Sequence, residues 1–174
     1  METDFLVISA SLNPESRSRI LAKTAYEKLK SKGKVNYMDL ADYKLPICDG
    51  NAAYGHEDVK KITPLVENAE AIILAAPIYN FAAASSAKNL IELTGNAWEE
   101  KTVGFLCAAG GSSSYMSIMG LANSLMLDFR CIIVPRFVYT DGSAFSDGKL
   151  VDPEIEKRVE ELTDALQRLH LRKF

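Results

Sequence analysis

The sequence predicts an α/β domain in which helices cover both faces of a parallel sheet. Short apolar segments of the kind that form buried strands alternate along the chain with segments whose apolar residues recur at helical spacing. Such alternation is typical of βαβ units, whose right-handed crossovers keep successive strands parallel. The 174 residues contain no repeat, low-complexity tract or long linker, so we expect a single domain over residues 1–174.

Five strands and five helices are expected. The strand segments are residues 4–10, 34–40, 69–77, 101–111 and 131–139; the second alternates and the third is the most apolar. The helical segments are residues 16–32, 57–69, 82–95, 115–129 and 152–170. Lys32-Gly33 and Gly95 mark helix ends, and Pro64 marks a candidate break or kink in the second helix. Residues 41–56 are expected to form a long loop.

Right-handed crossovers leave few topologies for five parallel strands. The natural choice is a flavodoxin-like three-layer sandwich with the strand order 2-1-3-4-5. In such sheets a ligand binds beyond the carboxyl ends of the strands, near the point where the strand order reverses. We therefore expect the loops after the first, third and fourth strands to form the functional site.

The composition narrows the class of protein and the compartment. A net charge of -3 gives no reason to expect nucleic acid or an anionic membrane as a partner. No apolar run reaches the roughly 18 residues of a membrane span, and the first residues lack the basic region of a secretory signal. Cys48, Cys107 and Cys131 are odd in number and form no CxxC pair, which argues against a disulfide framework or a zinc site. We expect no bound metal and a cytoplasmic location.

Serines and an arginine crowd the turn between the first strand and the first helix. Backbone N–H groups at a helix N-terminus lack partners, and the helix dipole favours negative charge there, so this position suits a phosphate. The alternative is that Ser16 or Asn13 only caps the helix and the other serines fill the loop. The candidate phosphate-binding residues are Ser9, Ser11, Asn13, Ser16, Arg17 and Ser18.

Two further loops follow the third and fourth strands. "PIYNF" (77–81) places two aromatic rings where a flat ligand ring would stack; the alternative is that Ile78 and Phe81 cap the core. "CAAGGSSSYMS" (107–117) contains paired glycines that let the backbone approach a ligand closely; the alternative is a strand-to-helix turn that needs positive φ. The candidate residues here are Pro77, Ile78, Tyr79, Asn80, Phe81, Ala109, Gly110, Gly111 and Ser114.

Together the three loops predict a phosphorylated aromatic cofactor. One loop suits phosphate, one an aromatic ring and one close backbone contact. Neither a P-loop nor a GxGxxG motif is present, and residues 7–22 contain no glycine, so a phosphate monoester fits this loop better than a pyrophosphate. FMN meets all three requirements.

The chain resembles the NADPH-dependent FMN reductase family of flavodoxin-like proteins. "ASLNPESRS" (10–18) is similar to that family's phosphate loop G-S-x-R-x-x-S-x-N, with serines at matching positions. "PIYNF" is similar to the P-x-Y-N-x loop that holds the isoalloxazine. The family's lysine–asparagine pair and its glycine pair match Lys88-Asn89 and Gly110-Gly111.

Five residues depart from the family pattern. Asn13 stands where the family has an arginine, so Arg17 is expected to supply the charge. Ile78 replaces the common glutamate before Tyr-Asn, and Ala82, Ala83 and Ala84 replace the usual glycine and proline. We expect FMN still to fit and the entry path of the second substrate to differ.

The resemblance implies a ping-pong oxidoreductase in which NAD(P)H reduces bound FMN and an acceptor then takes the electrons. The acceptor classes are a free flavin, a quinone, an azo dye or a metal oxyanion, and no residue is assigned as a general base. Arg17, Arg19 and Arg136 are candidates to bind the 2′-phosphate of NADPH. The family forms dimers and tetramers, and residues 114–129 are expected to form a helix that is apolar on more than one side, which fits a homodimer interface.

Two other classes compete with the enzyme. One is a flavodoxin-type electron carrier, although such carriers commonly show a strongly acidic face and the acidic residues here are dispersed. The other is a flavin-free protein that binds a different phosphate ligand. Oxidation of NAD(P)H distinguishes the carrier from the enzyme, and the colour of the purified protein distinguishes the flavin-free protein.

Overall fold

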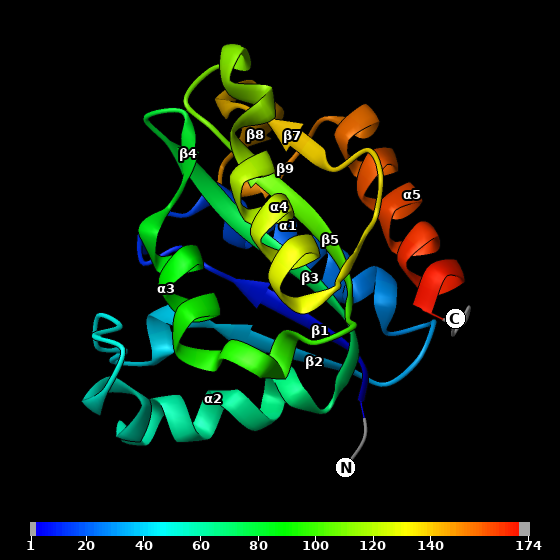
Figure 1. The fold of residues 1–174 in the computed structure, drawn as a ribbon. Helices are drawn as coiled ribbons and strands as arrows, with labels where there is room; N and C mark the ends of the chain where they lie inside the picture. Colours follow the sequence, from blue (N-terminus) through cyan, green and yellow to red (C-terminus); the bar gives the residue numbers. More distant parts are fainter. Residues whose placement is uncertain (1–2, 171–174) are drawn as a thin grey trace.

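The structure is a computed structural model that describes residues 3–170. Its centre is a parallel sheet in the order β2-β1-β3-β5-β6, with β7 also paired to β5 (Figure 1). This arrangement confirms the predicted flavodoxin-like order. The strands are β1 (Thr3–Ser9), β2 (Val35–Asp39), β3 (Ala69–Tyr79), β5 (Thr102–Ala108), β6 (Ile132–Ile133) and β7 (Val138–Thr140).

Helices cover both faces of this sheet and confirm the three-layer sandwich (Figure 1). One face carries α1 (Arg17–Leu29) and α5 (Pro153–His170), and the other carries α2 (Glu57–Glu67), α3 (Ser85–Thr94) and α4 (Met119–Phe129). Pro64 does not end α2, which runs through it to Glu67. Among the described residues, no helix is long and apolar enough to cross a membrane.

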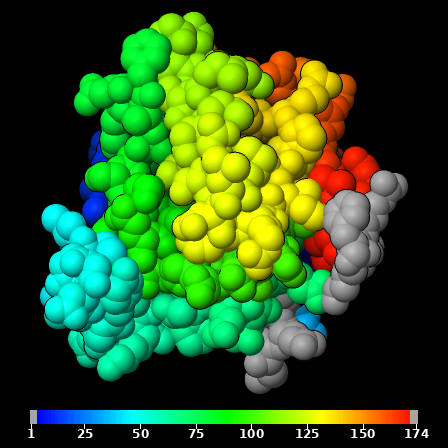
Figure 2. Space-filling model, viewed as in Figure 1, coloured from blue at the N-terminus to red at the C-terminus, as the bar shows by residue number. Residues whose placement is uncertain are grey.

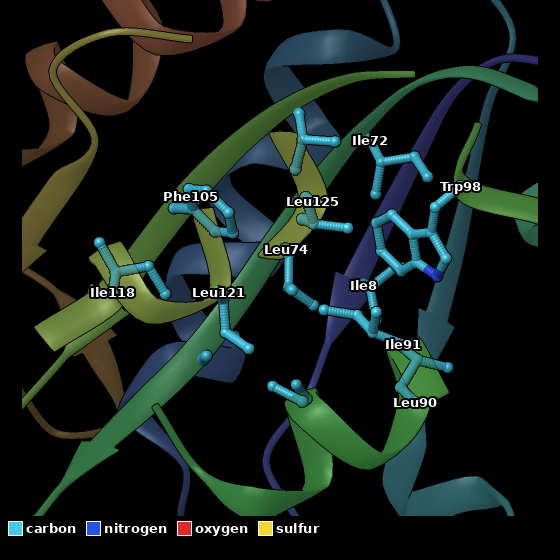
Figure 3. Close-up of a cluster of buried hydrophobic side chains, with 14 of the residues drawn as sticks. Ile8, Ile72, Leu74, Leu90, Ile91, Trp98, Phe105, Ile118, Leu121 and Leu125 are labelled. Carbon is cyan, nitrogen blue, oxygen red and sulfur yellow. The ribbon is translucent and has the colours of Figure 1, made fainter. Parts of the chain in front are cut away.

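The strands are apolar because both of their faces are buried. In β1, Leu6 and Ile8 join the core beneath α2, α3 and α4, whereas Phe5 and Val7 join the core beneath α1 and α5. Figure 3 shows Leu74 among the packed side chains of the first of these cores. Two hydrophobic cores therefore hold the strands in register, and they fix where the loops beyond the carboxyl ends must lie.

The expected fifth strand, residues 131–139, is divided. β6 and β7 both pair with β5, but residues 134–137 between them are not strand. Pro135 lacks a backbone N–H for a sheet hydrogen bond, and Arg136 has a positive φ of 60°. The prediction of a strand at this place in the sheet is confirmed, and the prediction that it is continuous is wrong.

Two expected helices begin later than the sequence suggested. β3 continues to Tyr79 and pairs with the short antiparallel strand β4 (Ala82–Ala83), so α3 begins at Ser85 rather than at residue 82. Residues Ser112–Ile118 form a 3₁₀ segment, η4, before α4 begins at Met119. A small hairpin of β8 (Phe145–Ser146) and β9 (Lys149–Leu150) was not predicted.

The long loop after β2 is tied to α2 and α3. The Asn89 side chain donates to the carbonyl of Pro46 and accepts from the N–H of Cys48, both at 2.8 Å. Asp58 accepts from Lys61 at 2.7 Å and from the N–H of Lys44 at 2.8 Å. The Lys61 hydrogen bond, followed by that of the Lys44 N–H, holds the pKa of Asp58 below its ordinary value of 3.8.

This lowered pKa predicts an acid-sensitive contact. A carboxylate whose pKa is depressed on folding stabilises the native state above its unfolded pKa, and that contribution is lost as the pH falls through the folded pKa. Asp58→Asn is therefore expected to destabilise the protein near pH 7 and to have a smaller effect below about pH 4. Urea unfolding of both proteins at several pH values measures this, and a pH-independent difference would contradict it.

Candidate functional site

The first wall of the site is the start of α1. Ser16 is the N-cap, because its Oγ accepts from the N–H of Arg19 at 3.1 Å and lies 2.9 Å from the Oγ of Ser18. Its carbonyl accepts from the N–H of Ile20. The N–H groups of Arg17 and Ser18 have no partner inside the helix and point out of its N-terminus. The capping role of Ser16 is therefore confirmed, and the cap leaves room for an anion as well.

Hydrogen bonds within the loop before α1 fix its shape. The Oγ of Ser11 accepts from the N–H of Asn13 at 3.2 Å, and the Oδ1 of Asn13 accepts from the N–H of Glu15 at 3.0 Å. Asn13 and Ser11 therefore hold successive turns of backbone. The hydroxyl proton of Ser11 stays available to a ligand, since only its oxygen is used.

Arg19 organises this loop, a role the sequence did not reveal. Its guanidinium donates to the carbonyls of Asn13 at 2.7 Å, Pro14 at 3.0 Å and Ser11 at 3.1 Å, and it forms a bidentate ion pair with Asp39. The hydrogen bond to Asp39 raises the pKa of Arg19. Because Arg19 draws the loop carbonyls toward itself, it is engaged in structure and is a poor candidate for the 2′-phosphate of NADPH.

The second wall is the tight turn between β3 and β4. Asn80 and Phe81 have positive φ angles of 50° and 61°, which fits a two-residue hairpin turn of type I′. Tyr79 is 53% exposed and Phe81 69% exposed, whereas Ile78 is 6% exposed. The alternative in which both Ile78 and Phe81 cap the core holds for Ile78 alone, and the two aromatic rings are free to contact a ligand.

The third wall is the glycine loop after β5. Neither Gly110 nor Gly111 has a positive φ, so the alternative of a turn that demands glycine is wrong. A Cβ at either position would meet no atom of the described chain within 4 Å. The space in front of both glycines is therefore open to a ligand.

Tyr139 on β7 fastens this glycine loop. Its hydroxyl donates to the carbonyl of Gly111 and lies 2.8 Å from the Oγ of Ser114. Tyr115 stacks on Phe137 with ring centroids 4.6 Å apart and meets Tyr139 edge-on. No local sequence signal marks Tyr139, because its hydrogen-bond partners lie 25 and 28 residues away along the chain.

The three walls enclose one cavity of about 830 Å³, a size typical of ligand sites. Every candidate residue named from the sequence for the three loops lines it, with the exception of Ser9, whereas Arg19 and Arg136, named for the 2′-phosphate of NADPH, do not. The lining residues are Ser11, Asn13, Glu15, Ser16, Arg17, Ser18, Pro77, Ile78, Tyr79, Asn80, Phe81, Ala108, Ala109, Gly110, Gly111 and Ser114.

Ser9 lies outside this cavity. It is the last residue of β1 and is fully buried within the sheet, paired in register with Asp39 and Ala75. By strand alternation its side chain shares the face of Phe5 and Val7. Its position does not support the expected phosphate contact.

The positive φ of Phe81 strains the backbone, so we expect substitutions here to exchange stability for flavin affinity. A bulky residue in the left-handed region costs on the order of 1–3 kcal/mol. Phe81→Gly removes that strain, loses little burial and adds chain entropy to the unfolded state, so we expect about 0.5–1 kcal/mol of net stabilisation together with weaker flavin binding. Phe81→Leu is the matched control, because it removes the ring and keeps the strain. Unfolding and flavin titrations of both variants measure the effects, and an equal gain in stability for Leu would contradict this account.

The residues present fit FMN. Unpaired N–H groups and hydroxyls line the cavity at the start of α1, and two exposed aromatic rings and an unobstructed glycine backbone line its other two walls. Within residues 3–170, no cluster of three His, Cys, Asp or Glu side chains could hold a metal ion.

Comparisons with known proteins agree with this chemistry. The sequence model of the NADPH-dependent FMN reductase family matches residues 3–145. An NAD(P)H-dependent FAD/FMN reductase of Geobacillus thermodenitrificans (strain NG80-2) is 30% identical over 139 residues, which cover 78% of this chain and 75% of the relative. An NADPH azoreductase of Bacillus sp. (strain OY1-2) is 27% identical over 162 residues, which cover 90% of this chain and 89% of the relative.

A solved structure supports the fold. FerB, a flavoenzyme NAD(P)H:(acceptor) oxidoreductase from Paracoccus denitrificans, superposes with a TM-score of 0.79 at 19% identity and covers 98% of each chain. From the family match and the curated relative, this chain belongs to the NADPH-dependent FMN reductase family and is an NAD(P)H-dependent oxidoreductase with FMN as its cofactor.

Proposed function

We propose that the 830 Å³ cavity is the FMN site and that the enzyme works by a ping-pong cycle. The observation that carries this proposal is the meeting of three loops in one cavity, with an anion-binding helix start at one end and exposed aromatic rings at the other. A phosphate on an aromatic cofactor needs both ends at once, because neither alone would orient it. A single domain over residues 1–174 suffices for this site.

Different residues of the cavity would bind the phosphate, the flat ring and the ring edge of FMN. Ser11, Ser16 and Ser18, with the N–H groups at the start of α1, would hold the phosphate, and Arg17 would neutralise it. Tyr79 and Phe81 would contact the flat ring. FMN supplies the hydride and electron transfer, so the protein needs no general base of its own. The N–H groups of Gly110 and Gly111 would donate to the ring edge, where fixed donors favour negative charge.

An adjoining cavity bears on the acceptor. It has a volume of about 500 Å³ and shares Asn13, Pro77 and Tyr79 with the flavin cavity. Leu45 and Ile47 are among the apolar residues that line it. Among the acceptor classes considered, this surface favours planar apolar molecules, a quinone or an azo dye, over a metal oxyanion.

We also propose a homodimer or homotetramer in the cytoplasm. Figure 2 shows that α4 lies on the surface of the chain, with no other described element over it. Met126 and Leu127 on this helix are 39% and 85% exposed, and Met116 just before it is 63% exposed. Apolar side chains of this size on one side of the molecule support an interface between subunits. Light scattering of the purified protein measures the assembly, and a monomer at micromolar concentration would contradict it.

A spectrum of the purified protein tests the catalytic proposal. After addition of FMN and desalting, we expect retained flavin absorption that bleaches when NADPH or NADH is added without oxygen. Steady-state rates with a quinone and an azo dye should then give parallel double-reciprocal lines. Retained colour that neither nucleotide bleaches would favour the carrier, and no retained flavin would overturn the assigned site.

A further inference from the structure

We propose that the groove between α1 and the β8–β9 hairpin binds the second phosphate and the adenosine of FAD. This inference rests on the proposed flavin site and extends it to the dinucleotide form. The groove is a separate cavity of about 860 Å³, comparable in volume to the flavin cavity itself.

The two cavities meet at the phosphate loop. Glu15, Ser16 and Arg17 line both of them, so a ligand phosphate held at the start of α1 lies at the entrance to the groove. Arg17 is exposed, and its guanidinium lies against Gly142, where a Cβ would stand only 2.8 Å from the Arg17 Nη1. Arg17 lines both cavities, so its guanidinium can serve a phosphate on either side.

The groove has two rigid walls. Ile20, Lys23, Thr24 and Glu27 recur at helical spacing and form one face of α1. Opposite them lies the hairpin, whose Asp147-Gly148 turn has φ angles of 48° and 71°, as a type I′ turn requires. A two-residue turn of this type holds its strands in a fixed register, so the groove has a defined shape.

The charges in the groove suit an additional phosphate. Across residues 3–170, Arg17, Lys23 and Lys149 form no ion pair within 4 Å, so their charges remain available to a ligand. Two of the carboxylates in the groove are already engaged: Glu27 pairs with Lys30 at 2.9 Å and Glu156 with Lys28 at 3.4 Å. The remaining carboxylates are Glu15 and Asp147.

An apolar surface lies beside these cations. Ile20 of α1 faces Phe145 and Leu150 of the hairpin, and all three line the groove. A purine base needs such a surface, and an aromatic ring adds stacking. The serine loop holds one phosphate, so the second would lie beyond it against Arg17, with the adenosine further along the groove.

Flavin titrations of the flavin-free full-length protein test the inference. The variant is Lys23→Gln with Lys149→Gln, since neither residue lines the flavin cavity, and Lys157→Gln on α5 is the control for loss of a surface charge. We expect wild type to bind both FAD and FMN. The double variant should bind FAD about tenfold more weakly and FMN less than twofold more weakly, since charge-assisted contacts to one phosphate are removed.

Other results of these titrations would overturn the inference, and they show whether the proposed function fails with it. Failure to bind FAD, or equal effects on FMN and FAD, would overturn the inference and leave the proposed function intact. A raised KM for NADPH in the FMN-loaded double variant, with unchanged FAD affinity, would assign the groove to the adenosine phosphate of NADPH and overturn it too. If neither flavin binds, the proposed function fails and this inference fails with it.

Discussion

Arg19→Lys is expected to weaken FMN binding by at least about tenfold while riboflavin binding changes less than twofold. The Arg19 guanidinium donates to three carbonyls of the loop before α1. The N–H groups at the start of α1 are therefore left free to face a phosphate. Lysine keeps the positive charge beside Asp39 but is a point donor, and it cannot reproduce the planar fork that spans these acceptors. Riboflavin has no phosphate and therefore reports only on the ring end of the site.

The ratio of the two affinities distinguishes positioning from general damage to the fold. Fluorescence titrations with FMN and riboflavin give this ratio, and Arg158→Lys on α5 is the control because its pair with Glu154 is exposed. Arg19→Leu should also unfold more easily, by about 3–5 kcal/mol, since it leaves the 8% exposed Asp39 without its cation. Equal losses of FMN and riboflavin affinity in Arg19→Lys would remove Arg19 from the phosphate site.

The fold and the place of the candidate site at the sheet edge are predictable from the sequence because they depend on local periodicity. Apolar runs mark the strands, and the rule that parallel strands end at one edge of a sheet brings three loops together that are far apart in the sequence. Tyr79 and Gly110 are found in this way, since each lies where a predicted strand ends. The ends of strands and helices are harder to predict: the turn at Asn80 and Phe81 lacks glycine, so nothing in the sequence indicates β4.

The residues that hold the loops in place are not predictable from the sequence. Arg19 acts through Asp39, twenty residues away, and Tyr139 acts through Gly111 and Ser114. These contacts depend on tertiary packing, which no spacing rule encodes. Ser9 lies outside the cavity for a simpler reason: the strand runs through it, and a residue that pairs on both sides inside a sheet is not part of the following loop.

Gly111→Val is expected to lower FMN affinity by at least about tenfold and to leave the free energy of unfolding of the flavin-free protein within about 0.5 kcal/mol of wild type. Gly111 has φ −166° and ψ 176°, an extended backbone that valine adopts readily. No atom of the described chain lies within 4 Å of a Cβ there, so the added methyl groups meet empty space in the flavin-free protein. In the proposed complex they meet the ring.

Gly55→Ala is the matched control, because it also adds a Cβ where nothing lies within 4 Å, but outside the flavin cavity and away from α4. Alanine restricts the unfolded chain more than glycine does, so this variant should be at least as stable as wild type, with unchanged FMN affinity. Urea unfolding and flavin titration measure both quantities. A destabilised Gly111→Val would mean that the glycine serves the fold, whereas a stable variant that still binds FMN normally would show that the ring does not approach this loop. Only a loss of binding without a loss of stability supports the proposal, since it alone requires that a ligand occupies the space in front of the glycine.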